Sequence, residues 1–398
     1  MASNKDMEES NHTALPTIPT NETNNVDQKK PSPPCSDSEL ESTVRLEKKI
    51  ELINPESLLN PELSNNENVM KGDVIEADEG TYAESLLDIL DDYPLDATEI
   101  DCVHSRVSSI PSLRLERFKN VIRLCLRQNT ITEIEGLSCL ANTLTELDLY
   151  DNLISHIRHL DKLIHLTSLD LSFNKIKHIK NISHLHSLTD LYFVQNKISH
   201  IENISGLTKL RNLELAANRI RKIQGLETLT GLEELWLGKN KITEIMGLDT
   251  LQKLKILSIQ SNRITSITGL TLQKSLEELY ISHNGLTNLS GLEACSSLRI
   301  LEISNNKVTS LKGLEHLSHL QELWASHNEL ESFSEVESVL ADKKELVTVY
   351  FEGNPLQSKG PAVYRNKVKL ALPQVLQIDA SKRIINPFQP HPIQAKRS

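Results

Sequence analysis

Three histidines recur at a fixed interval and are the first candidates for chemistry. His156, His178 and His200 lie about 22 residues apart, in the same register of the sequence. Imidazole binds metals and titrates near neutral pH, so such a row can form a metal site or a pH switch. No evident carboxylate completes a metal site beside the row. A row of solvated side chains is therefore the favoured interpretation.

Other reactive side chains are spread along the chain and do not converge. Cys125 can act as a reactive thiol or as a partly buried contact residue, and the second interpretation is favoured. The 5 cysteines include no C-x-x-C pair, which indicates reduced thiols inside a cell. The sequence has no phosphate-binding glycine loop, no H-E-x-x-H motif and no nucleophile elbow. We therefore expect no enzyme activity, no metal and no cofactor.

The regular interval comes from an internal repeat, which must position all these side chains. One copy is LRNLELAANRIRKI at 210–223, with the pattern L-x-x-L-x-L-x-x-N-x-I-x-x-I. The closing asparagines are Asn129, Asn152, Asn174, Asn196, Asn218, Asn240, Asn262, Asn284, Asn306 and Asn328, with Asn354 beyond. An interval of about 22 residues is typical of leucine-rich repeats. The sequence predicts an α/β leucine-rich-repeat solenoid: a curved horseshoe with a parallel concave sheet, short helical or 3₁₀ turns on the convex side and a C-terminal cap.

The residue types within one coil predict which side chains face the core. Leu213 and Leu215 are two residues apart on a strand, so both point inward and Glu214 points outward. Asn218 lies where the chain turns, and its amide is expected to bond backbone groups in a ladder from coil to coil. One coil cannot bury its own leucines, so stacking of coils must do so.

Charge and composition divide the chain into an arm and an array. Residues 1–100 hold about 23 acidic and about 7 basic side chains, within a net charge of -11. Residues 1–78 are predicted to be a disordered acidic arm. Ser32, Ser36 and Ser38 lie in motifs that can be phosphorylated, but a solvating tail is the favoured interpretation. The sequence has no run of about 18 apolar residues, so we expect no membrane span. We also expect no secretory signal at the N-terminus.

The array and its two ends complete the predicted organisation. A cap helix is expected at 79–98, a solenoid of about 11–12 coils at 99–354, a C-terminal cap at 355–385 and a flexible tail at 386–398. The side chains expected to cover the last coil are Tyr364, Val368, Leu370, Leu372 and Leu376.

The outward residue between the two strand leucines repeats in every coil and forms what we call the central column. It reads Asp101, Cys125, Asp148, Asp170, Tyr192, Glu214, Trp236, Ser258, Tyr280, Glu302, Trp324 and Tyr350. Both tryptophans of the chain and three of its 7 tyrosines fall in it. Large aromatic residues on a solvent face are typical anchors of a protein-binding surface, although they can also support strand packing.

Acidic residues flank the central column and indicate the kind of partner. The flanking acids are Glu146, Asp190, Glu234, Glu278 and Glu322. An acidic face with aromatic anchors fits a protein with a basic or mixed patch. Such a face repels nucleic acid, so nucleic acid is not an expected partner, and neither is a membrane.

Several phrases of the array resemble one family. They are LDLSFN, LGKNKIT, QSNRIT, ELYISHNGL, LQELWASHNELES and VYFEGNPLQ, followed by the cap pattern NPL…YR.KV…LP…ID. From about Asp96 to Ala380 the chain resembles the leucine-rich-repeat regulatory subunits of protein phosphatase 1, the family of the yeast mitotic regulator. The acidic arm lies outside this resemblance.

The resemblance implies a regulatory subunit that binds the phosphatase 1 catalytic subunit through its concave face. It implies control of the enzyme's state, maturation or targeting, including in mitosis, in the nucleus and cytoplasm, and a ternary complex with a second phosphatase inhibitor. The implied contact residues are Asp170, Tyr192, Glu214, Trp236, Glu302, Glu322, Trp324 and Tyr350. The central column itself adds Asp148 and Tyr280. The alternative is an adaptor scaffold of another complex, such as a ubiquitin ligase, a cytoskeletal assembly or a splicing particle.

Overall fold

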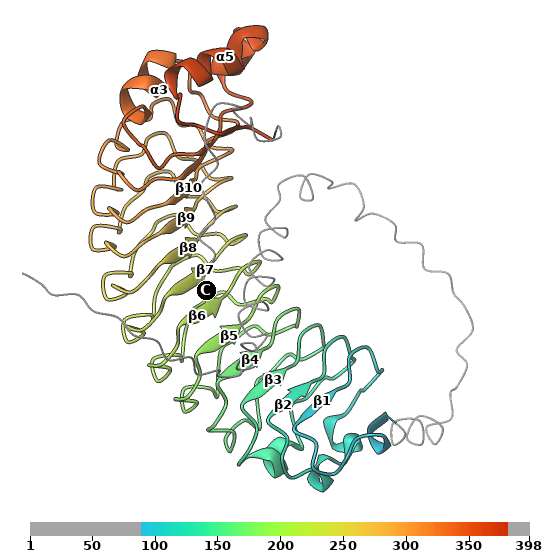
Figure 1. Cartoon of the computed structure of the whole chain (residues 1–398). Helices are drawn as coiled ribbons and strands as arrows, with labels where there is room; N and C mark the ends of the chain where they lie inside the picture. The colour runs from blue at the N-terminus through green and yellow to red at the C-terminus, as the bar shows by residue number, and fades with distance from the viewer. Residues whose placement is uncertain (1–88, 381–398) are drawn as a thin grey trace, which may run out of the picture. The chain divides into compact units, whose positions relative to one another are not determined.

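The computed structural model describes residues 89–380, which form one curved parallel β-solenoid (Figure 1). A single sheet of 13 strands runs in chain order from β1 to β13. The strands are β1 (Glu99–Asp101), β2 (Arg123–Cys125), β3 (Glu146–Asp148), β4 (Ser168–Asp170), β5 (Asp190–Tyr192), β6 (Asn212–Glu214), β7 (Glu234–Trp236), β8 (Ile256–Ser258), β9 (Glu278–Tyr280), β10 (Ile300–Glu302), β11 (Glu322–Trp324), β12 (Thr348–Tyr350) and β13 (Gln377–Ile378). This confirms the predicted leucine-rich-repeat horseshoe.

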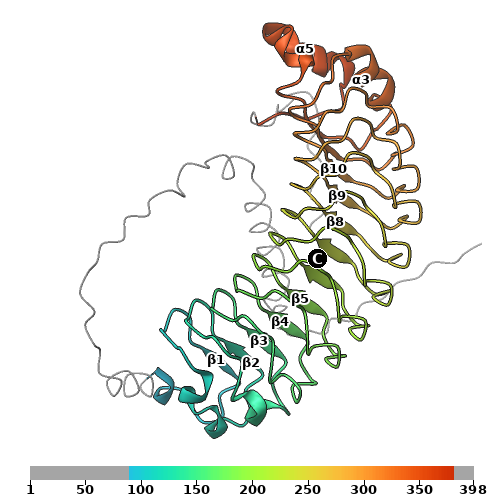
Figure 2. The same ribbon diagram turned by 180° about the vertical axis from the view of Figure 1, so that it is seen from behind.

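Helical segments are few and lie near the two ends. Besides the helical residues 89–91, they are the 3₁₀ helices η3 (Ile110–Leu113), η4 (Leu115–Arg117) and η5 (Leu137–Leu140), and the α-helices α3 (Phe333–Leu340), α4 (Pro355–Ser358) and α5 (Pro361–Ala371). Between η5 and α3, turns alone connect the strands on the side opposite the sheet (Figure 2). None of the helices in residues 89–380 has the length and apolar character needed to cross a membrane.

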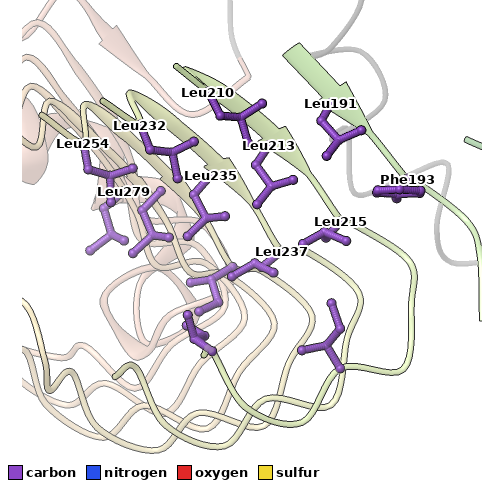
Figure 3. Close-up of a cluster of buried hydrophobic side chains, with 14 of the residues drawn as sticks. Leu191, Phe193, Leu210, Leu213, Leu215, Leu232, Leu235, Leu237, Leu254 and Leu279 are labelled. Carbon is purple, nitrogen blue, oxygen red and sulfur yellow. The ribbon is translucent and has the colours of Figure 1, made fainter. Parts of the chain in front are cut away.

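Equal coil lengths place each repeat position beside its own copy. Leu213 pairs in parallel with Leu191 on one side and with Leu235 on the other. All three side chains are fully buried, and Figure 3 shows them stacked in a continuous leucine core. Each such burial contributes about 1.5–3 kcal/mol, so the stack of coils supplies the stability that one coil lacks.

The asparagine ladder forms as the sequence predicts. The Asn218 Nδ2 amide donates to the carbonyl oxygens of Phe193 at 2.8 Å and Leu215 at 3.1 Å. Its Oδ1 accepts the backbone N–H of Ile198 at 2.9 Å. One buried amide therefore satisfies backbone groups of its own coil and of the preceding coil.

Tyr93 covers the backbone edge at the N-terminal end of the sheet. Its hydroxyl donates to the carbonyl oxygen of Asp101 at 2.9 Å and accepts the Asp101 N–H at 3.0 Å, which satisfies backbone groups of the first strand in the described sheet. The predicted cap helix at 79–98 is described only from residue 89. Its visible part is helical at 89–91, with Leu90 buried.

The C-terminal segment closes the core with α5 and adds β13 to the sheet. Tyr364, Val368 and Leu372 are buried against the last coil, as expected. The expectation is wrong for Leu370 and Leu376, which are 84% and 37% exposed. Leu370 lies on the face of α5 opposite the buried one, because the helical period turns position 370 away from 364, 368 and 371. The predicted arm at 1–78, with its three serines, and the tail at 386–398 lie outside the described residues.

Candidate partner-binding surface

Parallel pairing brings the central column together on one face of the sheet. Trp236 pairs with Ser258, Tyr280 with Glu302, and Glu302 with Trp324. Nine of the ten predicted contact residues occupy the third position of their strands: Asp148, Asp170, Tyr192, Glu214, Trp236, Tyr280, Glu302, Trp324 and Tyr350. The tenth, Glu322, is the first residue of β11 and lies on the same face as Trp324.

Alternate strands carry an acid and an aromatic residue that are hydrogen-bonded to each other. The donor–acceptor distances are 3.4 Å for Tyr192 Oη to Asp190, 3.1 Å for Trp236 Nε1 to Glu234, 2.8 Å for Tyr280 Oη to Glu278 and 2.9 Å for Trp324 Nε1 to Glu322. Each pair spans two residues of one strand, so both side chains lie on the same face. Sequence reasoning identified these residues but missed the pairing, whose signal is the tripeptide D/E-L-Y/W in β5, β7, β9 and β11.

The aromatic rings lean across the strands between them. Trp236 and Tyr280 stack with their ring centroids 6.3 Å apart and an interplanar angle of 19°. Ser258, on the strand between them, is 1% exposed, and Tyr280 itself is 5% exposed. Trp324 lies 5.6 Å from Tyr350 in a tilted arrangement. The expectation of large aromatic residues on a solvent face is therefore wrong for Tyr280 and also for Tyr192, which is 8% exposed.

Glu302 is a buried carboxyl between two of these aromatic strands. It is 3% exposed, and its Oε2 atom has no hydrogen-bond partner among residues 89–380. Burial raises the pKa of Glu302 to about 7, against a smaller opposing effect of a hydrogen bond with Ser282. Near neutral pH this carboxyl is therefore divided between its protonated and ionised forms.

We expect the Glu302→Gln substitution to flatten the pH dependence of stability. Because the folded-state pKa lies above the unfolded value, the folded protein holds the proton more tightly, and its stability falls as pH rises from about 4.5 to about 7. The ionised form costs about 3 kcal/mol, so urea unfolding should show Glu302→Gln more stable than the unmodified protein at pH 8.

Glu244→Gln, at an exposed site, is the matched control and should leave the profile unchanged. If the free energies of unfolding of Glu302→Gln and the unmodified protein change in parallel with pH, ionisation of this carboxyl has no cost in stability and the prediction is wrong.

Arginine changes the charge of the concave face at its N-terminal end. Arg127 lies 3.3 Å from an Asp148 oxygen and 3.9 Å from an Asp170 oxygen, and its guanidinium packs 4.3 Å from the Tyr150 ring centroid. Burial, with the nearby Asp148 charge, raises the pKa of Asp170 to about 6. The face is therefore not uniformly acidic, since Arg127 offsets both aspartates. Sequence reasoning missed Arg127 and Tyr150. Each lies two residues after a member of the central column, Cys125 or Asp148, and strand alternation therefore places it on the same face.

The three histidines in one register do not share a common partner. His178 Nδ1 lies 3.2 Å from a Glu202 oxygen, whereas His156 and His200 each contact the hydroxyl of the preceding serine. Glu202 therefore lies beside one histidine of the row, but a single His–Glu contact does not complete a metal site. Between residues 89 and 380, no group of three or more His, Cys, Asp or Glu side chains is placed to hold a metal ion.

Cys125 lies on the concave sheet but is not exposed to solvent. Burial raises its pKa to about 11, with backbone hydrogen bonding acting in the opposite direction. The thiolate is the reactive form, so burial disfavours the reactive-thiol interpretation. At 2% exposed, the side chain is also more buried than the partly buried contact residue that was expected. Cys102, Cys125, Cys139 and Cys295 are free thiols.

Comparison with known proteins agrees with this architecture. A leucine-rich-repeat family model matches residues 147–272, and a model of two leucine-rich repeats matches residues 274–316. The internalin InlF of Listeria monocytogenes has a solved structure with a TM-score of 0.59, which covers 76% of this chain and 95% of that one at 24% identity. At that identity the likeness concerns the fold alone.

Two curated relatives share a shorter, more similar segment. "Protein phosphatase 1 regulatory subunit SDS22" of Schizosaccharomyces pombe is 56% identical over 79 residues, which are 20% of this chain and 23% of that protein. The protein of the same name from Saccharomyces cerevisiae is 45% identical over 81 residues, 20% of this chain and 24% of its own length. The matched segment thus spans about a quarter of these relatives. Within it, the family resemblance inferred from the sequence motifs is confirmed.

Proposed function

This chain is a leucine-rich-repeat protein, and from that premise we propose that it is a regulatory subunit of protein phosphatase 1. The proposed contact is between the phosphatase catalytic subunit and the concave face. The observation that carries the proposal is the row of hydrogen-bonded acid–aromatic pairs on alternate strands. The similarity to proteins named as phosphatase 1 regulatory subunits supports the choice of partner.

The pairs are suited to binding because they hold their aromatic residues in place before a partner arrives. Trp236 and Trp324 are both half-buried, and each indole N–H donates to a glutamate two residues before it. A side chain that is already ordered loses little conformational entropy on binding. Tryptophan is also enriched among residues that contribute most to interface energy.

The carboxylates beside these rings favour a partner patch that contains basic residues. Glu278 accepts a hydrogen bond from Tyr280, and Glu322 accepts one from Trp324, which leaves their remaining acceptor capacity for a second donor. An arginine or lysine of the partner can pack on an indole face and approach these carboxylates at the same time.

The proposed action is regulation by selective binding, with no chemistry at this surface. A rigid solenoid that prefers one conformational state of the phosphatase shifts its population towards that state. The proposal includes roles in maturation, targeting and mitosis, in the nucleus and cytoplasm, and a ternary complex with a second inhibitor. These roles rest on the family resemblance of the sequence motifs.

We expect Trp324→Ala to weaken binding of the phosphatase 1 catalytic subunit by about 100-fold. The substitution removes an ordered anchor from the interface and leaves Glu322 without its indole donor. The measurement is the Kd between the full-length chain and the purified catalytic subunit, by calorimetry or biolayer interferometry. Thermal unfolding should show that the variant remains folded.

Leu370→Ala is the matched control, because Leu370 is a large apolar residue that is 84% exposed on α5. It should bind as the unmodified chain does. Equal Kd values for Trp324→Ala and Leu370→Ala would place the contact away from the concave face. Failure of the unmodified chain to bind the catalytic subunit would instead favour an adaptor in another complex.

A further inference from the structure

A row of basic residues follows the asparagine ladder on one edge of the solenoid. We call it the basic ridge; it consists of Lys175, Lys197, Arg219, Lys241 and Arg263. The backbone N–H of each donates at 2.8 Å to the carbonyl oxygen of an isoleucine in the preceding coil. The five positions are therefore in register in five consecutive coils, separated by the usual interstrand spacing of about 4.8 Å.

The ridge residues have no carboxylate partners within the described part of the chain. Basic residues on the opposite edge, just before the strands, do have carboxylate partners. Arg211 and Lys255 both contact Glu233, and Arg299 contacts Glu277. No ion pair joins any of the five ridge residues to an acid in residues 89–380. The two edges therefore differ in the pairing of their charges.

Neighbouring residues strengthen the positive charge of this edge. Lys177, Arg221, Lys222 and Lys239 lie within three residues of ridge positions and are exposed, whereas Glu244 is the acid found in the same stretch of these coils. Like charges on adjacent strands repel one another and lower stability. An anionic ligand lying along the ridge would relieve this repulsion.

We propose that the basic ridge is a docking surface for an acidic, extended peptide segment of a partner protein. The five ridge positions span about 19 Å, which matches about six residues of an extended chain. The ridge lies beyond the turn that ends each strand, outside the concave face, so this proposal does not depend on phosphatase binding.

The surroundings of the ridge favour a peptide over a nucleic acid. A duplex is about 20 Å wide and would bring its phosphates towards the acidic concave face beside the ridge. A single strand requires aromatic side chains on which its bases can stack. The residues just before the five ladder asparagines of the ridge coils are Phe173, Gln195, Ala217, Lys239 and Ser261. Only Phe173, in the first of these coils, is aromatic, so the other four coils offer no ring at this position on which a base could stack.

The test is a charge reversal on the full-length chain, Lys197→Glu with Arg219→Glu and Lys241→Glu. The probe is a fluorescein-labelled polyglutamate peptide, with its Kd measured by fluorescence anisotropy at low and physiological salt. The unmodified chain should bind the peptide in a salt-dependent manner, and the triple variant should bind it about tenfold or more weakly.

The matched control is Lys209→Glu with Lys253→Glu and Lys274→Glu, three exposed lysines away from the ridge. This variant has the same net charge as the first and should retain most of the peptide affinity. Equal losses in the two variants would show an effect of net charge alone and overturn the proposal. Tighter binding of a single-stranded oligothymidine than of the peptide, lost on ridge reversal, would also overturn it and assign the ridge to nucleic acid.

Discussion

Replacing Asn218 with alanine should lower the free energy of unfolding by about 4 kcal/mol. The substitution leaves the buried N–H of Ile198 without its acceptor. It also removes one of the two amide donors to the carbonyl oxygens of Phe193 and Leu215, which keep their bonds from Asn196 and Asn240. Each buried polar group left without a partner costs about 1–3 kcal/mol, and the methyl group of alanine replaces none of these bonds. Urea unfolding of the full-length chain, followed by circular dichroism, measures the loss.

Asn288→Ala is the control for this prediction, because Asn288 is exposed and bonds only to groups within two residues of itself. Its effect should stay within about 0.5 kcal/mol. A similar loss for both asparagines would mean that the ladder contributes little beyond helping the chain to turn.

The ladder also explains why this fold can be predicted from sequence. An asparagine amide presents a donor and an acceptor on one planar group, so it can bond its own coil and the preceding coil together. The ladder persists even at Asn354, where the coil is lengthened by α3, because the insertion lies outside the strand and its turn. Recurrence of asparagine at a constant interval therefore indicates both the strand register and the face on which Glu214 and Trp236 lie.

The exposure of the column residues could not be predicted in the same way. Strand alternation predicts that Tyr280 and Glu302 point away from the leucine core, and they do. It does not encode how far a tryptophan leans along the sheet, which depends on the hydrogen bond between Trp236 and Glu234 and on the small Ser258 beside it. Repeat periodicity therefore predicts the face of a residue, whereas the neighbouring side chains determine its burial.

Charge shows the same division between sequence and structure. Arg211 and Arg219 are eight positions apart and look equivalent in the sequence. Coil geometry places Arg211 beside Glu233 of the next coil, at 4.0 Å, whereas Arg219 lies next to the lysines of the basic ridge. The net charge of a segment could not distinguish the paired Arg211 from the ridge residue Arg219, because ion pairing depends on which positions of successive coils become neighbours.

Asp379→Ala is expected to destabilise the C-terminal end by about 4 kcal/mol. Asp379 is fully buried, and its Oδ1 accepts the N–H groups of Phe351 at 2.9 Å and Glu352 at 3.1 Å and the Tyr364 hydroxyl at 3.1 Å. Arg365 lies 3.4 Å from its second oxygen. Loss of the carboxylate leaves these donors without this acceptor, which costs more free energy than the loss of one neutral hydrogen bond.

Because each coil contacts only its neighbours, this damage should begin at the last strand and spread inward. Hydrogen exchange by mass spectrometry should therefore show lost protection first in α5 and β13, with β5 and β6 protected for longer. Asp342→Ala is the control, since the Asp342 side chain is 77% exposed and its one ion pair, with Lys343, is long at 3.9 Å. Uniform loss of protection along the solenoid in Asp379→Ala would instead show that the coils unfold as one cooperative unit and that the cap stabilises all of them together.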